Sequence, residues 1–107
     1  MLKQRLKVAT IYCVMAVLAV PAAAQDSGAE TYKARCAMCH GEDGTANTPA
    51  GKAFKAASFN EPAIVKIPDL DRIAIVKKGK DKMPAFGDKL TDDQIKSVLA
   101  YIRTLQK

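Results

Sequence analysis

The sequence has no tryptophan, a single histidine and only three cysteines among its 107 residues. It also lacks long basic tracts and basic stretches interleaved with aromatic residues, which argues against nucleic-acid binding. Strand signals are weak, and no segment repeats another. The one long apolar run, from Val8 to Val20, is too short to cross a bilayer comfortably. We therefore expect neither a nucleic-acid-binding protein nor stable insertion in a membrane.

The N-terminal segment has the features of a secretory signal peptide. Lys3, Arg5 and Lys7 precede the apolar run, and Ala22 and Ala24 follow it in the small-residue pattern of a cleavage site. The alternative is a retained N-terminal anchor. We expect cleavage after Ala24, so that residues 1–24 are a signal peptide and residues 25–107 are a single exported domain. The protein would then be secreted across the inner membrane into the periplasm, or into a compartment like the thylakoid lumen.

Residues 25–107 are few for an independently stable domain. A chain this short buries only about 60% of its unfolded surface, and small domains often recruit a disulfide, a metal or a cofactor. The domain keeps two cysteines, Cys36 and Cys39, which lie too close in sequence for a disulfide between them to hold a fold together. We therefore expect a bound cofactor to complete the core.

The first two helical signals are separated by a long irregular stretch. Ser27 and Glu30 are spaced as a capping box, which predicts a helix over about 28–37. A second helix is predicted from Asp69, its expected cap, to Gly79, which ends it; Leu70, Ile73 and Ala74 follow helical spacing along it.

The third helical signal is the strongest. Thr91 and Gln94 form another capping box, and apolar residues recur along one stripe over about 92–105. Between about residues 41 and 66 no period is sustained, and we expect a loop with one short helical turn near 53–57. A loop this long is reasonable in a small domain if it wraps a large apolar ligand. The domain is therefore predicted to be all-α.

The run Cys36-Ala37-Met38-Cys39-His40 carries the chemistry of the domain. This C-x-x-C-H pattern is typical of c-type haem attachment. Each thiol adds across one haem vinyl group, and the histidine that follows becomes a ligand of the iron. The second ring nitrogen of His40 then needs an acceptor that fixes the ring. We expect a backbone carbonyl near Pro49 to supply it.

The same run of residues has two other possible uses. A thioredoxin-like dithiol would use Cys36 and Cys39 for redox chemistry, but that fold needs a βαβ pattern, and none is visible. A structural zinc site needs four protein ligands, and two cysteines and His40 would require an additional carboxylate. A single haem c, covalent through Cys36 and Cys39, agrees best with the export signal and the small core.

The second axial ligand could be methionine, lysine or none. Met38 lies inside the attachment run and cannot reach the opposite face of a haem. Met83 lies 43 residues after His40, and Pro84 fixes the chain direction after it. A core residue that fills a gap is the alternative role of Met83. We predict that His40 and Met83 both bind the iron, a pair that raises the reduction potential and favours electron transfer.

These residues resemble the class I c-type cytochromes, especially the small bacterial and photosynthetic members. The resemblance rests on the attachment run with Gly41, on Lys82-Met83-Pro84-Ala85-Phe86 and on the amphipathic segment 98–102. It implies a cytochrome c-like fold of three to four helices wrapped around a covalently attached haem. It also implies that the first and last helices cross, with Gly28 and Tyr32 meeting Tyr101 and Leu99. The stretch 54–67 and the missing tryptophan depart from the family pattern.

The same resemblance implies a soluble carrier that passes single electrons and is not an enzyme. A haem subunit or domain partner of a larger oxidoreductase complex is the alternative. Lysines gather in sequence around Met83, and a ring of them at the haem edge would steer docking onto an acidic redox partner. The residues concerned are Lys77, Lys78, Lys80, Lys82 and Lys89. We expect a monomer.

Overall fold

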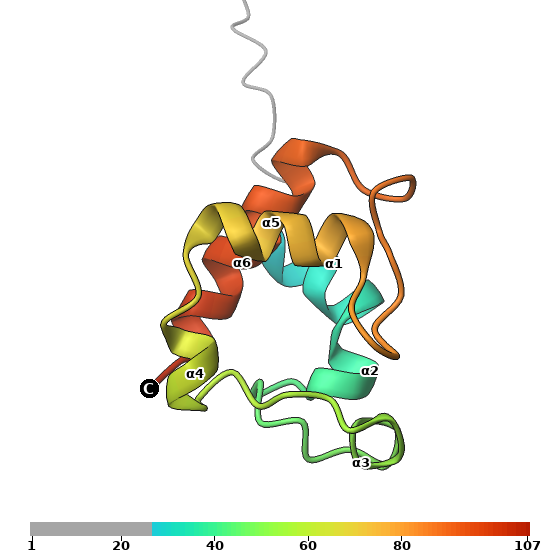
Figure 1. Cartoon of the computed structure of the whole chain (residues 1–107), viewed down its shortest axis with the longest axis vertical. Coiled ribbons are helices and arrows are strands. Elements are labelled where there is room, and N and C mark those ends of the chain that lie inside the picture. Colours follow the sequence, from blue (N-terminus) through green and yellow to red (C-terminus); the bar gives the residue numbers. More distant parts are fainter. Residues whose placement is uncertain (1–26) are drawn as a thin grey trace, which may run out of the picture.

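The computed structural model describes residues 27–107, so the expected signal peptide and its cleavage site lie outside the described residues. The described residues form six helical segments, α1 Gly28–Arg35, α2 Ala37–His40, α3 Pro49–Phe54, α4 Pro62–Val65, α5 Asp69–Lys78 and α6 Asp92–Leu105. Figure 1 shows them arranged around a central opening. Within residues 27–107 there is no strand, and β-type pairing is limited to an isolated bridge between Lys80 and Met83. The predicted all-α fold is confirmed, with three longer helices and three short ones.

The longest helix, α6, forms as its sequence predicts. Thr91 accepts a hydrogen bond from the Gln94 backbone, and the Gln94 side chain accepts one from the Thr91 backbone, which completes the capping box. The apolar stripe of α6 supplies half of the buried hydrophobic residues in the described part of the chain, Ile95, Val98, Leu99 and Ile102. This stripe is the main wall of the core.

Helices α1 and α6 pack closely because Gly28 has no side chain. A Cβ atom at Gly28 would lie 2.0 Å from the backbone oxygen of Ser97. One turn later in α1, the fully buried Tyr32 places its ring centroid 5.3 Å from that of Tyr101. Leu99 belongs to the same core cluster as Tyr32. The implied contact between the first and last helices is therefore present.

Two helix boundaries differ from the predictions. Helix α1 ends at Arg35, two residues before the predicted end at 37. Cys36 caps it with φ at −119°, and α2 then begins at Ala37. The short helix of the loop is α3, which starts earlier than the expected turn at 53–57. Thr48 caps it by accepting a hydrogen bond from the Gly51 backbone at 2.9 Å, and Lys55 ends it in the left-handed conformation. The cap at Thr48, rather than the alanines within residues 53–57, decides where α3 lies.

Helix α5 turns a different face inward than its apolar spacing predicts. Pro68, rather than Asp69, occupies the cap position, and Gly79 ends the helix with φ at +76°. Leu70 is 80% exposed, whereas Arg72 is 5% exposed.

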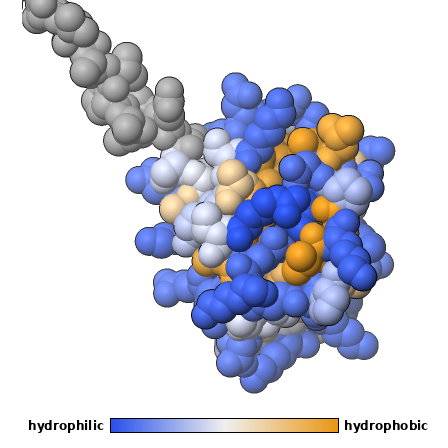
Figure 2. Space-filling view, turned by 90° about the vertical axis from the view of Figure 1, so that its left-hand side faces the viewer, coloured by the Kyte–Doolittle hydropathy of each residue, from blue (hydrophilic) through white to orange (hydrophobic). Residues whose placement is uncertain are grey.

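Figure 2 shows the face on the side of α4 and α6, where hydrophilic residues predominate and hydrophobic ones emerge in separate places. Among residues 27–107, no helix is both long enough and apolar enough to cross a membrane.

Candidate functional site

The four predicted site residues line a single cavity of about 450 Å³. Cys36, Cys39 and His40 reach it from the end of α1 and from α2, and Met83 reaches it from the loop between α5 and α6. Cavities of this size bind small molecules and cofactors. The fold therefore brings together residues that are 43 positions apart in the sequence.

The walls of this cavity are mainly apolar, and every helix contributes to them. It lies among the helices that surround the opening in Figure 1. The apolar lining includes Phe54, Phe59, Ile64, Ile67, Ile75, Val76, Phe86, Leu90, Val98, Leu99 and Ile102. Such walls suit a large apolar ring and exclude water from it. The long loop of residues 41–66 thus lines this apolar cavity.

His40 is held by the segment that follows α3. Its Nδ1 lies 2.9 Å from the backbone oxygen of Ala57, so the acceptor follows the end of α3, whereas the predicted place near Pro49 lies at the start of that helix. The ring of His40 also stacks on Phe59, with centroids 4.5 Å apart and planes 20° apart. Burial lowers the pKa of His40, and the hydrogen bond to Ala57 opposes this only in part. A neutral ring that donates through Nδ1 keeps the lone pair of Nε2 for a metal.

Thr48 fixes α2, the helix that presents His40, against α3. Its hydroxyl lies 2.8 Å from the backbone oxygen of Met38 and 3.0 Å from that of Cys39. Gly51 allows the same close approach, since a Cβ atom there would lie 2.2 Å from the Cys39 oxygen. The attachment run is thereby held against α3.

Cys36 and Cys39 are half-buried and form no disulfide with each other. Burial raises the pKa of Cys36 to about 11, and repulsion from Cys39 adds to the rise. A redox-active dithiol needs a lowered pKa, because the thiolate is the attacking species. The environment of Cys36 is therefore the opposite of that in a thioredoxin-like centre, and no strand of a βαβ unit occurs in residues 27–107.

The loop that carries Met83 is a tight turn. Lys80 and Met83 exchange backbone hydrogen bonds of 2.9 and 3.2 Å, and Asp81 between them takes a positive φ of 52°. After the turn, the Phe86 backbone donates to the Val76 oxygen at 2.9 Å, which returns the loop to α5. Both ends of the loop are thus fixed, and Met83 lies at the cavity wall, where it also packs against the hydrophobic core.

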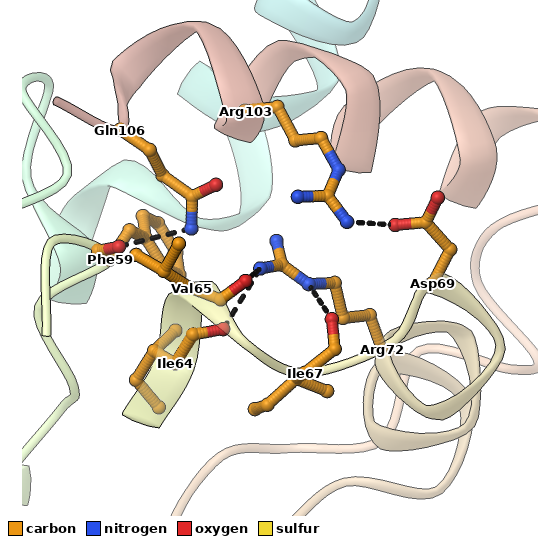
Figure 3. A network of polar contacts seen from close by, with 8 residues as sticks. All are labelled: Phe59, Ile64, Val65, Ile67, Asp69, Arg72, Arg103 and Gln106. Carbon is orange, nitrogen blue, oxygen red and sulfur yellow. Dashed lines mark hydrogen bonds and ion pairs between the residues drawn. The ribbon is translucent and has the colours of Figure 1, made fainter. Parts of the chain in front are cut away.

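Arg72 is a cavity residue that sequence analysis did not single out. From α5 its guanidinium donates to the backbone oxygens of Ile67 at 2.9 Å, Ile64 at 2.8 Å and Val65 at 3.1 Å (Figure 3). Burial lowers the pKa of Arg72, as does the nearby Arg103, whereas Asp69 opposes the shift. These bonds cap α4 and hold Ile64 and Ile67 at the cavity. The only sequence signal was a basic residue inside an otherwise apolar spacing.

The charged groups around the cavity are mostly positive. Its charged lining residues are Arg35, Lys55, Arg72, Lys80 and Lys82, against the single acid Asp81. A haem is a large apolar ring that carries carboxylate side chains, so an apolar cavity with a cationic surround fits it. No group of three or more His, Cys, Asp or Glu side chains gathers within residues 27–107, so this part of the chain contains no such cluster for zinc.

Known proteins resemble this chain in both sequence and fold. A family model described as cytochrome C oxidase, cbb3-type, subunit III matches residues 23–102. Cytochrome c6 of Thermosynechococcus vestitus is 34% identical over 105 residues, which cover 95% of this chain and 91% of the relative. Cytochrome c6 of Gracilaria tenuistipitata var. liui is 35% identical, with 76% and 72% covered. The solved KustC0563 c-type cytochrome superposes with a TM-score of 0.69 at 29% identity, over 76% of this chain and 99% of that one.

Proposed function

Since this chain belongs to the cytochrome c family, whose members carry electrons on covalently attached haem c, we propose that it is a soluble periplasmic carrier with one His/Met-ligated haem. Cys36 and Cys39 would hold the haem through thioether bonds, and His40 and Met83 would bind its iron. One observation carries this proposal: these four residues line the same apolar cavity. The family's role is electron transport and not catalysis of a substrate reaction.

Each side chain has a separate task. His40, fixed by its hydrogen bond to Ala57, offers Nε2 to the metal, and Met83 offers its thioether sulfur. When bound, the haem supplies an iron that alternates between ferrous and ferric states. With His40 and Met83 both bound to it, the iron would be closed to a substrate and to dioxygen. The apolar walls keep water away, so that little has to rearrange when an electron is transferred.

Docking is proposed to centre on Lys80 and Lys82. Both are exposed and line the cavity, so they lie where a partner would approach the cofactor. Lys78 is exposed close by on α5. Lys77 differs, since its Nζ lies 2.7 Å from an oxygen of Asp92 and its charge is partly compensated. An acidic surface on the redox partner would be drawn to this side, faster at low ionic strength.

A second candidate role is that of a haem subunit in a larger oxidoreductase complex. The description of the matching family model, an oxidase subunit, favours it. Native size separates the two roles. A carrier should elute from gel filtration as a monomer after mild extraction of the periplasm, whereas a subunit should co-elute with its complex.

The attachment itself is tested by denaturing electrophoresis with a haem stain. The chain should be produced in a host that can attach haem, with the double substitution Cys36→Ala and Cys39→Ala as the control. The wild-type band should stain, and the double variant should not. Mass spectrometry should show one haem per chain, and the N-terminal sequence of the periplasmic protein should begin at Gln25. An unstained wild-type band would contradict the proposal.

A further inference from the structure

The ring of His40 has a stacking partner in addition to its hydrogen-bond acceptor. The Phe59 ring lies 4.5 Å from the His40 ring, centroid to centroid, with an angle of 20° between the planes. The acceptor of the Nδ1 hydrogen bond is the backbone oxygen of Ala57, two residues before Phe59. One short segment, residues 57–59, therefore contacts His40 both at a ring nitrogen and over a ring face.

The hydrogen bond alone does not define the ring plane. Rotation about the Cβ–Cγ bond of histidine is a broad torsion with weak intrinsic preference. A carbonyl also accepts hydrogen bonds over a wide range of directions. A flat aromatic surface stacked on one face of the imidazole restricts this freedom, because rotation of the imidazole would break the offset-stacked contact.

Phe59 is itself held firmly enough to act as such a surface. Its backbone nitrogen donates to the Gly44 oxygen at 2.8 Å, and its backbone oxygen accepts from the side chain of Gln106 at 3.0 Å (Figure 3). The Phe59 ring also packs against the Tyr32 ring, with centroids 6.3 Å apart. Gly44 leaves room for it, since a Cβ atom there would lie 2.9 Å from Phe59 Cδ2.

We propose that Phe59 is a positioning residue that sets the plane of the His40 imidazole about the metal–nitrogen axis. The proposal rests on the proposed function, since it requires His40 to be an axial ligand. The orientation of an imidazole plane decides which iron d orbital its π electrons overlap. It therefore decides how unpaired spin is distributed over the porphyrin in the ferric protein, without changing which ligands are bound.

The test compares Phe59→Leu with Tyr101→Leu in the holoprotein. Both substitutions remove one ring from the cluster around Tyr32, but in the structure only Phe59 stacks on His40. The readout is the proton NMR spectrum of the ferric protein, in which haem methyl shifts report the axial ligand planes. We expect Phe59→Leu to reorder or compress these shifts, and Tyr101→Leu to leave their order unchanged. Phe59→Tyr, which keeps the ring, should retain the wild-type order.

Nuclear Overhauser contacts between the Phe59 and His40 rings in the ferrous wild type provide a test that needs no variant. Absence of these contacts, an unchanged shift pattern in Phe59→Leu, or equal changes in Phe59→Leu and Tyr101→Leu would each overturn the proposal. Failure of the proposed function looks different, because the wild-type ferric protein would then lack the near-infrared band of methionine–iron ligation. Phe59→Leu should keep that band.

Discussion

Lys82 places its Nζ 5.9 Å from the centroid of the Phe54 ring, so the loop that carries Met83 is tied to the end of α3. Both residues line the cavity. The contact joins two segments that otherwise approach the cavity from different parts of the chain. It offers a specific way to loosen the Met83 loop without altering Met83.

Replacing Phe54 with Ala should weaken the attachment of the Met83 loop to α3 by about 0.5–1 kcal/mol, the usual size of an exposed cation–π contact. The methionine–iron band of the ferric protein should disappear at a lower denaturant concentration than in the wild type. A cycle with Lys82→Gln and the double variant isolates the contact. Strictly additive effects on the midpoint would show that the two residues do not interact.

Substituting Gly28 with Ala should destabilise the protein, although Gly-to-Ala changes inside helices normally stabilise by about 0.5–1 kcal/mol. The new Cβ would lie 2.0 Å from the Ser97 backbone oxygen, so α1 and α6 would have to separate. Overpacking of this kind costs about 1–3 kcal/mol. Denaturant unfolding followed by circular dichroism gives the sign, and a more stable variant would refute the close crossing.

Tyr32→Phe should cost about 1 kcal/mol at neutral pH, because the hydroxyl donates to the backbone oxygen of Gly41 at 2.5 Å. Burial raises the pKa of Tyr32 well above its usual value. The folded state thus keeps the proton when the unfolded state begins to release it, above about pH 10. The stability due to this hydroxyl is full below that pH and is lost as the pH rises further.

The measurement for Tyr32 is the difference in unfolding free energy between wild type and Tyr32→Phe at about pH 8 and about pH 11. The difference should shrink at the higher pH, because only the wild type carries the ionisable hydroxyl. A difference that stays constant or grows would mean that Tyr32 ionises as readily in the folded chain as in the unfolded one.

Changing Lys80 and Lys82 to Gln should slow electron exchange with an acidic redox partner at low ionic strength by about tenfold, within the range known for electrostatic steering. Stopped-flow mixing at several salt concentrations measures both the rate and its salt slope. Lys77→Gln is the matched control, since it removes a lysine that is paired with Asp92. Equal effects of the paired and exposed lysines would argue against docking at the cavity mouth.

The sequence predicts the parts of this fold that depend on local signals. The capping box at Thr91 and the apolar stripe of α6 give its bounds without error, and the glycine stop at Gly79 is also confirmed. The loop between residues 41 and 66 could not be predicted in detail. Its conformation depends on Thr48, whose hydroxyl contacts α2, and on Lys55 in a left-handed conformation. Neither residue belongs to a periodic pattern that would reveal its role.

The candidate site, like the fold, could be predicted from the sequence only in part. Cys36, Cys39 and His40 stand in a run with a known chemical meaning, and Met83 follows from the small number of methionines. The acceptor of His40 is a backbone carbonyl, as predicted, but its place near Pro49 was wrong, because a backbone carbonyl has no sequence signature. Phe59 contacts Gln106, which is 47 positions away, and Arg72 contacts the carbonyls at the end of α4. Such contacts become visible only in the folded chain.

The most direct test of the central claim is a redox titration of the purified holoprotein, followed by visible and near-infrared spectra, with Met83→Ala and Met38→Ala alongside. Met38 is the matched control because it is 78% exposed and lies in the attachment run. A His40 and Met83 pair predicts a single one-electron step and a methionine–iron band that is lost in Met83→Ala and kept in Met38→Ala. A band that survives in Met83→Ala would contradict this ligand assignment.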